Sequence, residues 1–464
     1  LNGRVSLAVL EFFLTRRVNR IRGEARADLK LMGTWKKPDL KGEFSLHRTS
    51  IKLPNFDRNI EIPNGRVRLV PGAISLDQLE LRVGNHTVNA KGELLLDDRL
   101  RPDFVELNVD GEINMRLMRL FFPRRFSQAS GSAKIVKLKV EGLVDDPSIA
   151  GRIEVKRIDL VPRGLGRLLS LTSGMIDFDG YQYSIVEPLV GQYDEGQLTI
   201  TGAARFNRLE PIDVNLRLVG AAIPFRKPKV YSAETNFDLR LIGDNPEFTL
   251  KGEVDLVDAR YVREFDFLKQ MAIKPRVYEE DEPLWKSSAF LRDLKLALTL
   301  RSSGEMLVKN QYGKMSLSGG LKIEGSLSKP RLDGQVRADE GTFKFDGLWG
   351  EYSLTRGEII FDKDLPVEEA GLDVLAESQH TDPNGADYRI QVQQKGLLGN
   401  FQMKLSSIPK LDQGQILTLI ATGRTTDQLR SQLRGSQDGA ANIADEQIKT
   451  LTGRIISDIL SEKI

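Results

Sequence analysis

The sequence predicts an all-β protein that is elongated and built from repeats, and three observations support this prediction. Apolar and polar residues alternate over many short segments, which is the period of a β-strand with one apolar face. Glycine and proline recur at matched spacings along the chain. Segments with helical periodicity are few, so helices cannot cover the apolar faces of roughly two dozen strands.

The repeat is marked by glycine. Counted from Gly33, Gly142 and Gly325, a proline follows at +5, an aliphatic residue at +7, and further glycines at +9 and +32. Residues 170–179 and 353–362 agree at seven of ten positions. We expect these glycines to mark the turns of successive tiles in one continuous architecture.

The apolar faces of the strands must meet each other or line a shared interior. The alternation alone leaves two arrangements open: an array of closed sandwiches with a dry core, or a folded-over sheet with an apolar groove. With strands about 4.8 Å apart, such an array would be on the order of 100 Å long. The residues expected to line the groove are alternate apolar residues of the strands: Val67, Leu69, Leu79, Leu81, Val83, Ile153, Val155, Ile176, Phe178, Val214, Leu216, Leu218, Phe237, Leu239, Leu241, Leu294, Leu296, Leu298, Leu300, Ile359, Phe361, Tyr388, Ile390, Val392, Phe401, Met403 and Leu405.

Residues 1–22 are expected to form an amphipathic helical lead, because apolar residues recur at spacings of three and four: Leu7, Leu10, Leu14, Val18 and Ile21. Its second half is rich in arginine, so a position on a membrane surface and packing against the end of the fold both remain open. The chain contains no run of about 18 uncharged apolar residues, so no transmembrane helix is expected. Further helices are expected at residues 112–122, where the helix would cap exposed sheet or act as a lid, and at residues 163–172, 263–273, 412–421 and 440–461.

Composition and motifs argue against most kinds of chemistry. The 464 residues carry 67 Lys+Arg and 65 Asp+Glu, and the resulting net charge of +2 argues against general nucleic-acid binding through bulk charge. There is no cysteine, and the three histidines lie in different repeats, so no zinc site is expected. The glycines near residues 164 and 191 lack the partners of a dinucleotide site or a P-loop. We therefore expect no enzyme, no catalytic residue, no metal, no cofactor and no nucleic-acid partner.

The C-terminal part of the sequence resembles the TamB family. A predicted strand ends in Ser-Ser-Ile-Pro at residues 406–409, and a helix with the pattern Ile-Leu-x-Leu-Ile-x-x-Gly follows it. The matching residues are Ser406, Ser407, Pro409, Ile416, Leu417, Leu419, Ile420 and Gly423. The segments 329–334, 341–343 and 354–361 are also similar to the family. The resemblance is specific over residues 325–423 and looser, through the repeats, over residues 23–324.

The resemblance implies a β-taco, which is a sheet curled along its length with an apolar groove inside and a polar surface outside. It implies a protein of the periplasm of a Gram-negative-type bacterium, held in the inner membrane by an N-terminal helix that would precede residue 1. The implied partner in the outer membrane is a TamA- or BamA-like β-barrel. Residues 424–464 are then expected to be a helical tail, which the closing strands of the family would follow.

The function implied by the resemblance is the movement of phospholipids between the inner and outer membranes, with their acyl chains lying along the groove. Two alternatives remain open. The chain could be an accessory factor in the insertion and assembly of outer-membrane β-barrel proteins, or it could be a structural spacer that conducts nothing. The sequence leaves open the class of lipid, the direction of transport and the source of energy.

Overall fold

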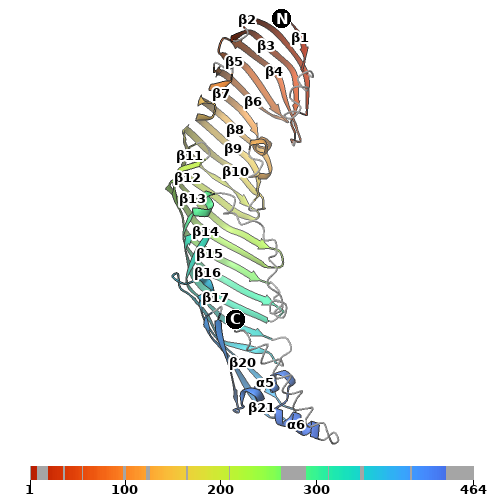
Figure 1. The fold of residues 1–464 in the computed structure, drawn as a ribbon, viewed down its shortest axis with the longest axis vertical. Helices are drawn as coiled ribbons and strands as arrows, with labels where there is room; N and C mark the ends of the chain where they lie inside the picture. The colour runs from red at the N-terminus through yellow and green to blue at the C-terminus, as the bar shows by residue number, and fades with distance from the viewer. Residues whose placement is uncertain are drawn as a thin grey trace. The chain divides into compact units, whose positions relative to one another are not determined.

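The computed structural model describes most of the chain as strands and a few short helices (Figure 1). The described residues are 2–7, 19–34, 37–54, 56–97, 101–121, 126–163, 166–207, 210–262, 289–311, 313–344, 350–397 and 400–434. They form 22 strands, which confirms the all-β prediction. The chain divides into two compact units. The first unit is Leu1–Ile223 with Arg240–Phe248, and the second unit is Pro224–Leu239 with Thr249–Ile464.

The first unit is an antiparallel meander. Each of its strands from β2 to β12 pairs with the strands that precede and follow it in sequence, and β1 pairs with β2. The strands are β1 (Asn2–Ser6), β2 (Arg20–Thr34), β3 (Lys37–Lys52), β4 (Asn59–Val70), β5 (Ala73–Val83), β6 (His86–Leu96), β7 (Pro102–Asn114), β8 (Phe126–Leu143), β9 (Asp146–Pro162), β10 (Leu169–Gly180), β11 (Gln182–Tyr193) and β12 (Gly196–Asn207). The boundary between the units falls within β13 (Glu210–Lys227), β14 (Tyr231–Asp244) and β15 (Glu247–Tyr261).

The second unit begins with a parallel pair. β15 runs parallel to β16 (Lys295–Asn310), and the long connection between them ends in α4 (Ala289–Asp293), as a parallel pair requires. The pairings that follow are antiparallel. The remaining elements are β17 (Gly313–Ser326), β18 (Lys329–Phe343), β19 (Tyr352–Phe361), η4 (Val367–Glu369), β20 (Gly371–Thr381), β21 (Asp387–Leu397), β22 (Asn400–Ile408), α5 (Gln413–Thr422) and α6 (Thr426–Arg434).

The glycine repeat is a β-hairpin with a fixed register. Gly33, Gly142 and Gly325 lie directly opposite the prolines that follow them at +5, across the hairpins β2–β3, β8–β9 and β17–β18. The aliphatic residue at +7 faces another aliphatic residue in each hairpin: Leu40 faces Leu31, Ile149 faces Val140, and Leu332 faces Ile323. The repeat in the sequence is therefore a repeat of strand pairing.

The glycines at +9 were expected at turns, and this expectation is wrong. Gly42, Gly151 and Gly334 lie inside β3, β9 and β18, each directly opposite a leucine of the neighbouring strand. At Gly151 (φ 140°) a Cβ atom would lie 1.8 Å from the carbonyl oxygen of Lys137. The glycine is needed because the neighbouring backbone approaches too closely for a side chain.

Mid-strand irregularities accompany the curl of the sheet. The register of β10 shifts between Leu171 and Ile176 against β11, and Gly174 (φ 141°) lies within this irregularity. A Cβ atom on Gly174 would lie 2.8 Å from the Cα atom of Leu189. β-bulges bend a strand and increase its twist, so repeated bulges curl the sheet. Within each unit the described strands therefore form an open, curled sheet, not the closed sandwich left open by the alternation.

The helical lead predicted for residues 1–22 is wrong over its described part. Asn2–Ser6 is strand β1, and the residues from Arg20 onward belong to β2, with which β1 pairs. Leu7, Ile21 and Ala25 are buried together, so their apolar surface is covered by strand packing. The predicted helix at 163–172 is also replaced from Leu169 by β10. Residues 8–18, 263–273 and 440–461 lie outside the described residues.

Helices were correctly predicted at two places. η2 (Met115–Leu117) and α2 (Met118–Phe121) lie within the predicted segment 112–122, although Glu112–Asn114 still belong to β7. α5 covers the predicted segment 412–421 except for its first residue, Asp412, which is the N-cap. The described part of the predicted helical tail is α6, and residues 435–464 lie outside the described residues.

The apolar face of the sheet

One face of the first unit carries a row of apolar residues that are cross-strand neighbours from β2 to β13. Each member of the row is opposite the next one on the adjacent strand, and none is charged. We call this set the apolar row: Ala25, Leu46, Gly65, Leu79, Ala90, Val109, Leu138, Gly151, Phe178, Tyr183, Ala204 and Val214. Because residues opposite each other in a sheet share a face, the row defines a continuous apolar face.

The predicted lining residues of the first unit lie on this apolar face. Leu79, Phe178 and Val214 belong to the apolar row itself. The others occupy parallel rows beside it, opposite apolar residues, glycine or His86 of neighbouring strands. These others are Val67, Leu69, Leu81, Val83, Ile153, Val155, Ile176, Leu216 and Leu218. Most of these side chains are partly exposed, whereas Val83, Val155 and Val214 are buried.

The opposite face is polar. Arg152 donates to Asp177 across β9 and β10 at 2.5 Å, and Arg66 pairs with Glu43 at 3.2 Å. Exposed pairs of this kind contribute about 0–1 kcal/mol each, so they keep the face soluble more than they stabilise the fold. A hollow on this face is lined mainly by charged side chains of β2, β3 and β4, so it is not an apolar site: Arg26, Asp28, Lys30, Lys41, Glu43 and Arg68.

The prediction missed several residues of the apolar face because bulges change the phase of alternation. In β9 the alternation Ile153, Val155 resumes one residue out of phase at Ile158. Ile158 is buried with Leu171 and Leu189, and neither of these was predicted. In the sequence, such a bulge is indicated by two segments of alternating apolar and polar residues whose alternation is offset by one residue.

The insert after β7 covers part of the apolar face. Met115 of η2 packs against the buried cluster that contains Ala133 and Val155. Arg116 forms an ion pair with Asp57 of the β3–β4 connection, which holds the insert in place. Of the two roles open for this segment, these contacts support a cap on the sheet.

In the second unit the predicted lining residues again share one face. Leu298 lies between Gly252 of β15 and Ile323 of β17, and Leu300 lies between Val254 and Leu321. Ile359 and Phe361 continue the face on β19, opposite Val336 and Gly334. Leu294 and Leu296 are buried, whereas Leu298 and Leu300 are partly exposed. Phe237 and Leu239 of the second unit and Leu241 of the first unit alternate along β14, and their side chains are partly exposed.

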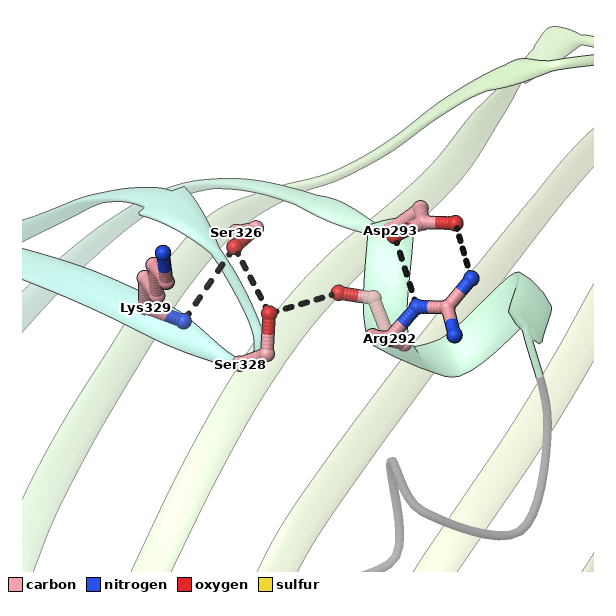
Figure 2. A network of polar contacts seen from close by, with 5 residues as sticks. All are labelled: Arg292, Asp293, Ser326, Ser328 and Lys329. Carbon is pink, nitrogen blue, oxygen red and sulfur yellow. Dashed lines mark hydrogen bonds and ion pairs between the residues drawn. The ribbon is translucent and has the colours of Figure 1, made fainter.

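A polar network fixes the start of β16 (Figure 2). The Ser328 hydroxyl, in the β17–β18 turn, donates to the backbone oxygen of Arg292 in α4 at 3.0 Å. Ser326 and Ser328 are 3.1 Å apart, and the backbone N–H of Lys329 donates to Ser326 at 3.1 Å. The network joins α4 to the hairpin turn and so sets where Leu294 and Leu296 enter the sheet.

At the C-terminal end the apolar face is covered by α5. Tyr352, Ala376, Ile390 and Val392 form one buried cluster with Ile416, Leu417, Leu419 and Ile420 of this helix. The side chains of Ile390 and Leu419 are 0% exposed. Tyr388, Ile390, Val392 and Leu405 are predicted to line the groove, and in the structure they pack in or against a core closed by the protein's own helix. The side chains of Phe401 and Met403 lie outside the described residues.

The residues of the Ser-Ser-x-Pro segment position α5. The Ser407 hydroxyl donates to the backbone oxygen of Pro409 and accepts from the backbone N–H of Leu411, both at 2.8 Å. Asp412 and Gln415 then form a capping box at the first turn of the helix. Gly423 (φ 73°) ends the helix in the left-handed region that favours glycine.

Asp382 links the β20–β21 turn to α6. Its Oδ1 atom accepts from the backbone N–H groups of Asn384 at 2.8 Å and Ala386 at 2.9 Å. Its Oδ2 atom accepts from the Gln428 side-chain amide at 2.5 Å. The N–H of Ala386, followed by the amide of Gln428, holds the pKa of Asp382 below its usual range.

Among the described residues, no group of three or more His, Cys, Asp or Glu is placed to hold a metal ion. Burial lowers the pKa of His380 and raises that of Tyr352. Tyr352 lies in the apolar cluster beneath α5, and the ring of His380 lies 6.4 Å from the Tyr352 ring. No helix in the described part of the chain is long and apolar enough to cross a membrane.

Comparison with known proteins agrees with this geometry. Residues 189–462, which are more than half of the chain, match the family model of the TamB C-terminal domain. Comparison with curated proteins gives no match. The TamB family is a non-enzymatic transport and assembly family of the bacterial envelope, and it works with partners in the outer membrane. The chain belongs to the TamB family.

Proposed function

We propose that the protein conducts phospholipids between the inner and outer membranes, with the acyl chains lying along its apolar face. The observation that supports this most directly is the apolar row, in which every strand from β2 to β13 contributes an uncharged residue to one face. An acyl chain that crosses this face meets no charge along the row. The polar headgroup can stay in water at the open edge of the sheet.

The energetics suit transport better than tight binding. Each methylene group removed from water contributes about 0.8 kcal/mol, so an acyl chain of about 15 methylenes gains on the order of 10 kcal/mol from full shielding. Rows of similar side chains recur about every 4.8 Å along the sheet, so a chain that slides by one strand exchanges one apolar contact for another. No single row holds the lipid more strongly than the next.

The rest of the proposal follows from the family. An inner-membrane anchor, as in the family, would place the sheet across the periplasm, and a TamA- or BamA-like barrel would receive the lipid at the outer membrane. The polar face, with exposed pairs such as Arg66–Glu43, would contact the aqueous periplasm. No cofactor is required for any of these steps.

Assembly of outer-membrane β-barrel proteins is the second candidate. Among the described residues, β22 pairs with β21 alone, so one of its edges offers backbone groups to another strand. A protein of this kind would bind nascent barrel strands at β22 and would not need the apolar row.

A charge on the apolar face tests these proposals. Leu216 lies on the apolar face opposite Gly202, whereas its neighbour Asn215 is exposed on the polar face. We expect Leu216→Glu to slow the arrival of phospholipid in the outer membrane at least tenfold, and Asn215→Glu to leave it within twofold. Transport that survives Leu216→Glu would support the spacer. Loss of barrel proteins with normal phospholipid transport would support the assembly role.

A further inference from the structure

We propose that α5 is a reversible stopper that occupies the apolar face at the C-terminal end of the path and must leave before cargo can pass β19. This inference rests on the proposed function. It starts from an unusual helix: the five consecutive residues Ile416–Ile420 are all buried. Successive residues of a helix point about 100° apart, so five buried positions mean that the middle of α5 is covered on every side.

The helix stands on the same face that lipid would use. Ala376 and Leu372 alternate along β20, and Leu372 is opposite Ile359, a predicted lining residue of β19. The side chains under α5 are closed to solvent, whereas Leu298 and Leu300 on β16 are partly exposed on that face. The apolar face is therefore accessible on β16 and occupied by protein on β20 and β21.

An acyl chain that replaced α5 would make the same kind of apolar contact with the strands beneath the helix. Ile390 and Val392 are covered by Leu and Ile side chains of α5, which are the same aliphatic groups that an acyl chain presents. If a lipid takes this place, the strands lose no apolar burial. The cost lies in the apolar side of α5, which needs another apolar surface when it leaves.

The attachment of α5 provides a hinge and a latch. Gly423 ends the helix, and α6 begins only three residues later at Thr426. The hydrogen bond from Gln428 to Asp382 then ties α6 to the β20–β21 turn. This polar contact joins the helical pair to the sheet, beside the apolar contacts that cargo can replace.

A reversible lock tests the stopper in the full-length protein. Residues 1–464 contain no cysteine, so Asp382→Cys with Gln428→Cys places a single cysteine pair within them, which a short reducible bis-thiosulfonate reagent can bridge. The control pair is Arg152→Cys with Asp177→Cys, which replaces a contact of equal length on the polar face. We expect bridging of residues 382 and 428 to slow phospholipid arrival in the outer membrane at least tenfold, with recovery after reduction. The bridged control should stay within twofold of its unbridged form. Unchanged transport by the locked protein would overturn the proposal.

A second measurement does not depend on the latch. Ile420→Ala removes apolar contact between α5 and the sheet, and a leucine-sized diazirine at Leu405 reports what then reaches the covered face. We expect Ile420→Ala to raise lipid adducts at Leu405 at least threefold, whereas Leu171→Ala in the first unit should not change them. No increase would overturn the stopper. Failure of the proposed function would give a different result from failure of the stopper. Lipid adducts would then be missing at Leu298 as well as at Leu405, whether or not residues 382 and 428 are bridged.

Discussion

The Asp382 carboxylate accepts a 2.5 Å hydrogen bond from the side-chain amide of Gln428, and this contact joins a turn of the sheet to α6. The same carboxylate accepts two backbone N–H groups from its own turn. Three donors converge on one ionised group, so the turn and the helix are stabilised together.

Loss of this ionised group should weaken the C-terminal end of the second unit. The pKa of Asp382 is lowered in the folded state, so its contribution is present above the unfolded pKa, near 3.9, and is lost as the pH falls below it. We expect Asp382→Asn to reduce the free energy of local opening at pH 7, because an Asn amide cannot accept hydrogen bonds at both of its side-chain atoms. Hydrogen exchange of β21 and α5 amides measures this. Asp373→Asn, which breaks an exposed pair with Arg356, should cost less than about 1 kcal/mol. An equal loss in both variants would contradict this assignment.

His380 should make the same region sensitive to mild acid. Burial lowers the pKa of His380 in the folded state. Below the pKa of His380 in the unfolded chain, near 6.5, the unfolded chain therefore binds a proton at His380 more readily than the folded chain does. Stability should therefore fall as the pH drops from 7 to 5.5. We expect amide protection of β20 to decrease over this range in the wild type and to be nearly flat in His380→Gln. A slope that persists in His380→Gln would assign the effect to another group.

The contrast between covered and open parts of the apolar face predicts two different costs for the same truncation. Leu419 is fully buried beneath its neighbours, so Leu419→Ala should cost about 2–5 kcal/mol. Leu298 is partly exposed, so Leu298→Ala should cost about 1–2 kcal/mol. Local opening free energies from hydrogen exchange around each site compare the two. Equal costs would mean that α5 does not close a core.

Gly174 should tolerate no side chain. Its positive φ and its 2.8 Å approach to the Leu189 backbone both disfavour alanine, so Gly174→Ala should cost about 2–4 kcal/mol. Gly371→Ala is the control, because a Cβ atom there would meet Ile360 at an ordinary 3.8 Å. Amide protection of β10, and of β20 for the control, measures the two effects. A stable Gly174→Ala variant would show that the bulge can relax.

The alternation of apolar and polar residues within one strand predicts well which residues lie on the apolar face. Alternation placed Ile153 and Ile176 on one face, and the structure sets them directly opposite each other. The change of phase at Ile158 escaped prediction because a bulge adds one residue, and the offset shows only when the alternating segments before and after it are compared. The repeat glycines were found by spacing, but the position of Gly151 inside a strand depends on the approach of a neighbouring strand.

Features that depend on distant parts of the chain were missed. The burial of Ile390 depends on a helix that begins more than 20 residues later, so alternation in β21 predicts an apolar face without showing what covers it. Leu7 and Ile21 fit a helical spacing, but Ile21 lies in β2 opposite Ile51 of β3 and is buried together with Leu7. Tertiary contacts decided both cases.

Site-specific photo-crosslinking at Leu298 tests the central claim most directly. Leu298 is partly exposed on the apolar face, and the next residue, Thr299, lies on the opposite face of the same strand. With a photoreactive residue at each position in the full-length protein in cells, lipid transport predicts at least tenfold more phospholipid adduct from position 298 than from position 299. Equal adducts at both positions, or no lipid adduct at position 298 in a protein that still functions, would contradict the account.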